Sequence, residues 1–304
     1  MKLRTIGKSN IQVPQLTLGT MSFNRDKKSV INMLSQALDQ GIIHIDTADL
    51  YDFGHNETLI GDFVKYHRDQ IVLTTKVGNH FNPQTKKWFW DPSRKYITTA
   101  VKDSLQRLQT DYIDLYLLHG GTIEDPVDET IEAFEELKKT GTIRTYGISS
   151  IRPNVIKTYM KKSNIDAVMM QYNLLDRRPE ELLDDLSEQQ ISVLARGPLA
   201  KGIISSKGES NITEKASDGY LEYNREALEQ VVRKLQAFEE PLEKLAFQYV
   251  LHHPAVISAV FGASSEKQIT NNSAYVHMDK MKDDVYQAIQ KITKPLYYKQ
   301  HRDL

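Results

Sequence analysis

The chain has 304 residues, with 39 lysines and arginines against 40 aspartates and glutamates, and it contains no cysteine. A formal charge of −1 gives no basic surface for nucleic acid, and the lack of cysteine excludes disulfides, thiolate metal sites and a cysteine nucleophile. The first residues lack the apolar core of a secretion signal, and runs such as 255–263 are too short to span a bilayer. We therefore expect a cytoplasmic protein with no membrane partner and no nucleic-acid partner.

Two short apolar segments at the start of the chain, 3–6 and 11–13, flank the polar turn 7–10. This pattern predicts a β-hairpin. After it, short Leu-, Ile- and Val-rich runs alternate with stretches of helical periodicity. The runs are apolar on both faces, as buried parallel strands are. They cover 15–19, 42–46, 71–76, 113–119, 145–149, 167–171, 192–196 and 257–262.

Eight strands that are each followed by a helix predict right-handed crossovers and closure into a (β/α)8 TIM barrel. We expect the hairpin to close the bottom of this barrel and long loops to surround its C-terminal mouth. The composition does not shift along the chain, so we interpret residues 1–304 as one domain. The long stretch 197–256 predicts a mobile loop, suited to a cofactor clamp or substrate lid, before helices near 228–238 and 242–251.

Two Asp-Pro pairs predict helix starts between these strands. Asp91 and Pro92 precede an apolar stripe that begins at Ile97, and Asp125 with Pro126 precede another stripe. We interpret each aspartate as an N-cap and each proline as a first-turn residue.

Several well-known motifs are not matched by this chain. The 7–9 segment lacks the first glycine of a P-loop, no G-x-G-x-x-G follows a strand, and HExxH and GxSxG do not occur. The pair His252 and His253 has no nearby carboxylate in sequence, so we interpret both as surface residues and expect no metal.

Chemistry in a TIM barrel takes place where the strands end, so polar residues at those positions are informative. Asp46, Lys76 and His119 end three successive strands, and Tyr51 lies in the loop after the first of them. Taken singly, each is as well explained by a loop cap, a solvated end or a structural histidine. Their combination predicts one polar site at the mouth.

These four side chains suit the donation of a proton to a carbonyl oxygen. A free phenol, with a pKa near 10, is a weak acid. A lysine cation about 4 Å away stabilises the phenolate by roughly 4 kcal/mol at an effective dielectric constant of about 20. Asp46 would keep Lys76 charged, and His119 would hydrogen-bond the carbonyl oxygen. None of these groups supplies a hydride, which implies a bound nicotinamide.

With these residues in this order, the chain resembles the aldo-keto reductases over nearly its whole length. The resemblance is carried by L-T-L-G-T-M at 16–21, D-T-A-x-x-Y at 46–51, Lys76, L-L-H at 117–119, G-I-S-S at 147–150, Q-Y-N at 171–173, P-L-A-K-G at 198–202 and G-A-S-S-E-K-Q at 262–268. It implies a small-molecule aldehyde or ketone as substrate and reduction by hydride transfer. Tyr51 would be the general acid, supported by Lys76, Asp46 and His119.

The resemblance also implies that NADPH binds across the barrel mouth. The positions that fall where the family binds its cofactor are Thr20, Met21, Ser149, Ser150, Gln171, Arg196, Gly197, Pro198, Leu199, Lys201, Gly262, Ser264, Lys267, Gln268 and Asn272. Two of them depart from the common pattern, because Ser150 stands where Asn is common and Arg196 where an aromatic residue often stacks on the nicotinamide. A guanidinium there would favour the neutral, reduced ring.

The resemblance implies NADPH rather than NADH, because Ser264 and Lys267 fall where the family holds the adenosine phosphate. Ser265 and Gln268 also form the pattern of a capping box, which needs no ligand, and the two interpretations are compatible. In the loop 78–92, Phe81, Trp88 and Trp90 fit either a substrate-binding wall or a small satellite core.

Two other functions stay open at this point. The chain could be an NADPH-binding regulatory protein with little turnover. Less in keeping with its residues, Lys76 could form a Schiff base in a lyase, although a paired ammonium is a poor nucleophile.

Overall fold

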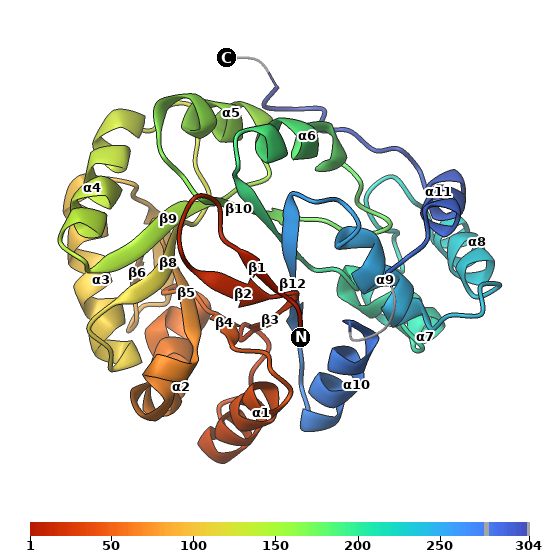
Figure 1. The fold of residues 1–304 in the computed structure, drawn as a ribbon, viewed down its shortest axis with the longest axis horizontal. Coiled ribbons are helices and arrows are strands. Elements are labelled where there is room, and N and C mark those ends of the chain that lie inside the picture. Colours follow the sequence, from red (N-terminus) through yellow and green to blue (C-terminus); the bar gives the residue numbers. More distant parts are fainter. Residues whose placement is uncertain (277–279, 303–304) are drawn as a thin grey trace.

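The computed structural model describes residues 1–276 and 280–302, which contain a closed barrel of eight parallel strands (Figure 1). Around the barrel the strands follow the order β10, β11, β12, β3, β4, β5, β8 and β9. They are β3 (Leu16–Gly19), β4 (His44–Asp46), β5 (Val72–Val77), β8 (Ile113–Leu118), β9 (Ile143–Ser149), β10 (Ala167–Gln171), β11 (Ser192–Arg196) and β12 (Val256–Gly262). The predicted TIM barrel is confirmed, and each strand lies close to its expected range.

Helices surround the barrel, and Figure 1 shows them as an outer ring. The α-helices are α1 (Lys27–Asp39), α2 (His55–His67), α3 (Arg94–Leu108), α4 (Val127–Lys139), α5 (Pro153–Lys162), α6 (Glu180–Glu188), α7 (Gly208–Lys215), α8 (Arg225–Leu235), α9 (Leu242–Val250), α10 (Glu266–Val276) and α11 (Asp283–Ile292). The 3-10 helices of the described residues are η1 (Tyr51–Gly54), η2 (Arg68–Gln70) and η3 (Ala200–Gly202). Within the described residues, no helix combines the length and apolarity that crossing a membrane requires.

Both predicted aspartate N-caps are wrong. The N-cap of α3 is Ser93, two residues after Asp91. The Ser93 side chain accepts a hydrogen bond from a backbone N–H of the first turn. α4 has Pro126 at its N-cap with no side-chain cap bond. The carboxylate of Asp125 accepts instead from the indole Nε1 of Trp90 at 2.8 Å. A donor from a distant part of the sequence, the Trp90 indole, therefore occupies the carboxylate oxygen that the Asp-Pro pattern predicts as a helix cap.

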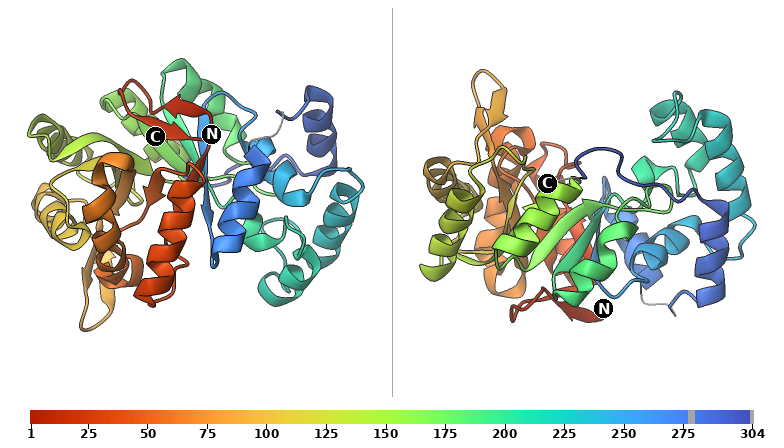
Figure 2. Two further views of the ribbon diagram at one scale, coloured as in Figure 1. Left: turned by 60° about the horizontal axis from the view of Figure 1, so that its bottom comes forward. Right: turned by 90° about the horizontal axis from the view of Figure 1, so that it is seen from above.

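The N-terminal hairpin closes one end of the barrel, as predicted. It pairs β1 (Leu3–Thr5) with β2 (Gln12–Pro14), and Ile6 and Val13 are fully buried. These side chains belong to one apolar cluster with Leu115 and Leu194 from the barrel interior. Figure 2, right, shows this hairpin at one end of the molecule and the hairpin of β6 (Asn79–Asn82) and β7 (Lys87–Trp90) at the opposite end.

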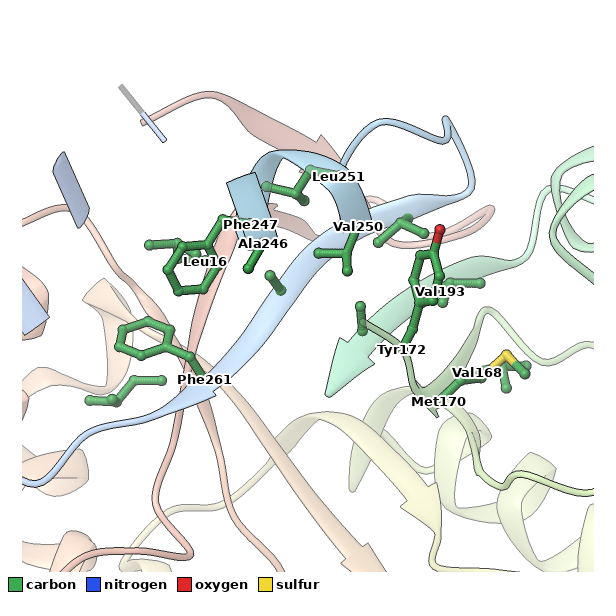
Figure 3. Close-up of a cluster of buried hydrophobic side chains, with 14 of the residues drawn as sticks. Leu16, Val168, Met170, Tyr172, Val193, Ala246, Phe247, Val250, Leu251 and Phe261 are labelled. Carbon is green, nitrogen blue, oxygen red and sulfur yellow. The ribbon is translucent and has the colours of Figure 1, made fainter. Parts of the chain in front are cut away.

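Alternation along the strands separates an outer face from an inner face. In β12, for example, Phe261 lies outside against Phe247 of α9, with ring centroids 5.9 Å apart (Figure 3). On the inner side, Thr17 and Thr74 both bond the buried His44, at 2.7 Å each. The interior thus changes from an apolar plug near the hairpin to a polar layer, and charged groups follow where the strands end.

The segment between β11 and β12 is more regular than the loop that its glycines predict. It contains η3 and the additional helix α7 before α8 and α9. Apolar side chains along it are buried, including Ile203, Ile212 and Tyr223. Packing of these side chains fixes a stretch whose glycine and serine content suggests an irregular loop.

Candidate active site

The centre of the site is a buried ion pair between the ends of β4 and β5. The Nζ of Lys76 lies 2.7 and 2.9 Å from the two carboxylate oxygens of Asp46, and it also donates to the carbonyl of Thr47 at 2.7 Å. Lys76 is 1% exposed and Asp46 is 3% exposed. Period-2 alternation places both side chains inside the barrel, since their strand neighbours Ile45 and Val77 belong to the outer core.

Tyr51 lies above this pair, in the short helix η1. Lys76 Nζ donates to the phenol oxygen of Tyr51 at 3.3 Å. The His119 ring lies edge-on to the Tyr51 ring, with centroids 6.0 Å apart and an interplanar angle of 82°. The four side chains that the sequence predicts at one mouth therefore come together in the structure.

The turn after Tyr51 is held in an unusual backbone conformation. Asp52 and Phe53 have φ of 48° and 53°, and Gly54 has φ of 86°, so three consecutive residues are left-handed. Such a conformation costs a non-glycine residue about 1–2 kcal/mol. Two contacts from outside hold it: Arg25 pairs with Asp52 at 2.6 Å, and Phe81 lies edge-on to Phe53. The turn fixes where the Tyr51 phenol stands.

The charges in the site determine which groups carry protons. Burial alone would lower the pKa of Lys76, but the Asp46 carboxylate and the Tyr51 phenol raise it above its ordinary value. Burial lowers the pKa of His119 to about 3, and the positive charges of Lys76 and Arg196 contribute. Lys76 is therefore an ammonium at neutral pH, whereas the imidazole of His119 is neutral.

A second polar group lines the mouth at the ends of β9, β10 and β11. Ser149, Gln171 and Arg196 have the same inward alternation as Asp46 and Lys76. Arg196 is exposed, and its Nη1 donates to Oε1 of Gln171 at 3.2 Å. The Nε2 of Gln171 donates to Asp176 and to Tyr220, so the carbonyl oxygen of this amide faces Arg196.

Three further predicted cofactor positions have different surroundings. Thr20 is fully buried, and its hydroxyl donates to Asn56 at 2.6 Å and to the Asp46 carbonyl at 3.1 Å. Met21, the next residue, is 71% exposed. Ser150 is buried, and its hydroxyl accepts the backbone N–H of Arg152 at 3.3 Å. Met21 is therefore the one of the three that is open to a ligand without rearrangement.

The remaining cofactor candidates lie in the loop after β11, in the loop after β12 and in α10. Gly197 to Lys201 follow β11 and lead into η3, where Lys201 has φ of 59°. Gly262 ends β12, and α10 begins four residues later. Among these candidates the exposed ones are Gly197, Lys201, Gly262, Ser264, Lys267 and Gln268, whereas Asn272 is buried.

The predicted capping box at the start of α10 is formed in part. Ser265 Oγ accepts the backbone N–H of Gln268 at 3.3 Å, as an N-cap does. The Gln268 side chain, however, accepts from the N–H of Ser264 at 2.8 Å rather than from that of Ser265. The box thus closes one residue earlier than the pattern predicts.

Three of the aromatic residues in the 78–92 loop share one face of a hairpin. β6 (Asn79–Asn82) pairs with β7 (Lys87–Trp90), and the register places Phe81 opposite Trp88 and Asn79 opposite Trp90. Alternation therefore puts Phe81, Trp88 and Trp90 on the same side. Trp90 packs closely over Gly78 and Gly120, next to His119, while Trp88 is 55% exposed. Trp90 packs against the core, as the interpretation of a satellite core expects. Trp88 remains exposed, as a substrate-binding wall requires.

The structure also shows two groups that the sequence did not single out. Asp49 is fully buried, and neither oxygen of its carboxylate has a hydrogen-bond partner among the described residues. Close by, Glu57 is buried and bonds Thr75 at 2.6 Å and Arg107 at 2.8 Å. Asp49 stands within the D-T-A-x-x-Y element, so its position was visible in the sequence, but its missing partners were not.

The second such group lies behind Gln171. Tyr220, from the segment after η3, accepts from the side-chain amides of Gln171 and Asn173 at 3.1 Å each. Asp176 accepts from the same Gln171 amide at 3.0 Å. No motif or periodicity marks Tyr220, because its contact with β10 depends on how the long segment folds.

This chain belongs to the aldo-keto reductases, because the family model described as "Aldo/keto reductase family" matches residues 15–294. Members of this family are oxidoreductases that act on small-molecule carbonyl compounds with a nicotinamide cofactor. The chain is 48% identical to the uncharacterised oxidoreductase YqkF of Bacillus subtilis, over 99% of this chain and 100% of that protein.

Solved structures of a related protein match the whole chain. The holo form of aldo-keto reductase AKR11C1 from Bacillus halodurans superposes with a TM-score of 0.95 at 48% identity, covering 100% of both chains. Its apo form superposes with a TM-score of 0.87 at 46% identity, again over 100% of both chains.

Asp49 generates a prediction about stability and pH. Burial, followed by the charge of Glu57, raises the pKa of Asp49 well above its ordinary value. Above about pH 3.9 an unfolded chain releases this proton while the folded protein retains it. The contribution of Asp49 to the free energy of unfolding therefore falls as pH rises towards its folded pKa, by up to about 1.36 kcal/mol per pH unit. We predict that Asp49→Asn raises the free energy of unfolding at pH 7.

Denaturant unfolding at pH 3.5 and pH 7 measures this effect. The advantage of Asp49→Asn over wild type should be small at the lower pH and larger at pH 7. Asp69→Asn, at an exposed position of η2, is the matched control and should show no such trend. An equal effect of Asp49→Asn at both values would contradict a buried, protonated Asp49.

Proposed function

We propose that this protein reduces an aldehyde or ketone to the alcohol with NADPH, and that Tyr51 donates the proton. The observation that carries this proposal is the bond of 3.3 Å from the Lys76 ammonium to the Tyr51 oxygen, beside His119 at the open end of the barrel. Each of these residues has a separate part in moving the proton.

The roles follow from the charges. The carbonyl oxygen of the substrate accepts the phenol proton of Tyr51, and the carbonyl carbon accepts a hydride from NADPH. The Lys76 ammonium stabilises the phenolate that remains, and Asp46 keeps Lys76 charged despite its burial. A neutral His119 can hydrogen-bond the carbonyl oxygen and orient the substrate, and it brings no further positive charge next to Lys76.

Bound NADPH supplies the hydride in this proposal. The residues at the mouth fit a nicotinamide carboxamide, because Gln171 turns its acceptor oxygen outward, with Ser149 at the end of β9 and Ser150 directly after it. The nicotinamide ring and the diphosphate of the cofactor would lie along the loop formed by Arg196, Gly197, Pro198, Leu199 and Lys201. Thr20 and Met21 would lie on the other side of the cofactor.

The choice of NADPH over NADH rests on the start of α10. Ser264 and Lys267 are exposed there, beside the N-terminus of the helix, and would hold the additional phosphate with Gln268. Gly262 and Asn272 complete the adenosine end of the proposed site.

Substrates with an apolar part suit the hairpin face defined above. Phe81, Trp88 and Trp90 share it, and Trp90 packs beside the strand end that carries His119. Aromatic side chains there would bury the apolar part of a carbonyl compound while its oxygen meets Tyr51.

The Schiff-base alternative is disfavoured by the surroundings of Lys76. Its Nζ meets Asp46, the Thr47 carbonyl and Tyr51, so the ammonium has an acceptor for each proton. A lysine nucleophile needs a free lone pair, which this arrangement opposes. The regulatory alternative predicts tight NADPH binding without turnover, and a screen of aldehydes, ketones and sugars for loss of NADPH absorbance separates it from a reductase.

Replacement of the proposed acid tests the mechanism. Tyr51→Phe removes the proton but retains the ring, so kcat should fall about 10²–10⁴-fold. The dissociation constant of NADPH, measured by its fluorescence, should stay near wild type. Tyr66→Phe, on the exposed side of α2, is the matched control and should leave both unchanged. Equal losses of kcat and NADPH affinity in Tyr51→Phe would indicate a structural role instead.

The charge of Arg196 generates a prediction about the two cofactor forms. A guanidinium beside the ring disfavours cationic NADP⁺ relative to neutral NADPH. Arg196→Tyr should therefore strengthen NADP⁺ binding relative to NADPH, by roughly tenfold if the charge is worth about 1.4 kcal/mol. Arg196→Lys, which keeps the charge, is the control. Unchanged relative affinities and cofactor fluorescence in Arg196→Tyr would contradict the placement of the Arg196 guanidinium beside the nicotinamide ring.

A further inference from the structure

The side chain of Asp176 lies just behind the polar group of the mouth. It is fully buried in the loop after β10. Its Oδ2 accepts from Gln171 Nε2 at 3.0 Å and from Arg178 Nη2 at 2.7 Å, and its Oδ1 accepts from Arg178 Nε at 2.7 Å. All three contacts are donors that point at one carboxylate, and a carboxylate can only accept.

This arrangement decides which way the Gln171 amide is turned. With Nε2 bound to Asp176 and to the Tyr220 oxygen, the carbonyl Oε1 must face Arg196, whose Nη1 donates to it at 3.2 Å. The opposite orientation would place Oε1 against the Asp176 carboxylate and Nε2 against a guanidinium. The first contact would then pair two acceptors, and the second would pair two donors.

The carboxylate itself is held from the far side. Arg178 forms a two-pronged ion pair with Asp176 and lies over the ring of Tyr298, 5.0 Å from its centroid. Tyr298 belongs to the C-terminal segment after α11, which Figure 1 shows running past α6 towards α5. Contacts therefore run without a break from this segment through Arg178, Asp176 and Gln171 to Arg196 at the mouth.

We propose that Asp176 is a positioning residue, which fixes the Gln171 amide and, through it, the Arg196 guanidinium in the orientation that receives the nicotinamide end of the cofactor. The inference rests on the proposed function, because it concerns the same cofactor. It adds a residue that does not touch the mouth and whose effect passes through Gln171. The C-terminal segment then contributes to cofactor binding through Arg178, without itself reaching the ring.

A double-mutant cycle on NADPH affinity tests this role without using turnover. The dissociation constant is measured by cofactor fluorescence for wild type, Gln171→Ala, Asp176→Ala and the double variant. We expect Asp176→Ala to weaken NADPH binding about tenfold in the wild-type background and to have no further effect when Gln171 is already alanine. Asp185→Ala, at an exposed position of α6, is the control and should leave the affinity unchanged.

The outcomes separate this inference from the proposed function. If Asp176→Ala costs the same in both backgrounds, or nothing in the wild type, Asp176 does not act through Gln171 and the inference fails alone. If Gln171→Ala leaves NADPH affinity unchanged, the proposed carboxamide site fails and the inference falls with it.

A second pair of variants keeps the volume of both side chains, so that the test does not depend on Asp176→Ala folding. Gln171→Glu turns an oxygen towards the Asp176 carboxylate and should weaken NADPH binding. Asp176→Asn in the same chain offers that oxygen a donor and should restore part of the affinity. The absence of any restoration would overturn the inference.

Discussion

A buried ion pair inside a closed barrel is the constraint on which the rest of this site depends. Removing an ammonium and a carboxylate from water is expensive, and a buried pair is often no more stable than apolar residues of the same size. Here Asp46 and Lys76 occupy the interior just where the strands end, with the Thr47 carbonyl as a further acceptor. The pair presents a positive charge to one phenol at the barrel mouth.

Other parts of the fold preserve that geometry. The apolar plug of the N-terminal hairpin closes the opposite end of the interior, and a hydrogen-bonded layer around His44 separates the plug from the ion pair. Above the pair, the left-handed turn at Asp52 and Phe53 determines the position of Tyr51 relative to Lys76. Strain in that turn persists because Arg25 and Phe81 hold it from two sides.

The sequence was sufficient to predict the barrel and the meeting of its charged residues. Parallel strands alternate with period 2 and end at one rim, so Asp46, Lys76 and His119 had to share the interior once their strands were recognised. The same alternation brings in Gln171 and Arg196. Local patterns were weaker guides: Asp91 and Asp125 precede prolines as N-caps do, but tertiary and loop donors use their oxygens instead.

The parts that could not be predicted depend on long-range contacts with no local signature. Tyr220 reaches β10 only because the segment after β11 folds into η3 and α7, against the expectation of a mobile loop. Asp176 precedes Arg177 and Arg178 in sequence, and nothing there indicates that its carboxylate would turn to Gln171. Within the part of the chain that the structure describes, the lack of hydrogen-bond partners for the Asp49 carboxylate is likewise a property of the packed molecule.

The most direct test of the account replaces the carboxylate that holds the lysine. Asp46→Asn keeps the shape of the side chain but removes its charge, so Lys76 loses the group that holds it protonated in the barrel. Single-turnover reduction of a carbonyl compound by the NADPH-loaded variant should be slower than wild type by about 10²–10⁴-fold, with NADPH affinity and melting temperature recorded alongside. Reduction at the wild-type rate would contradict the claim that this ion pair makes Tyr51 a proton donor.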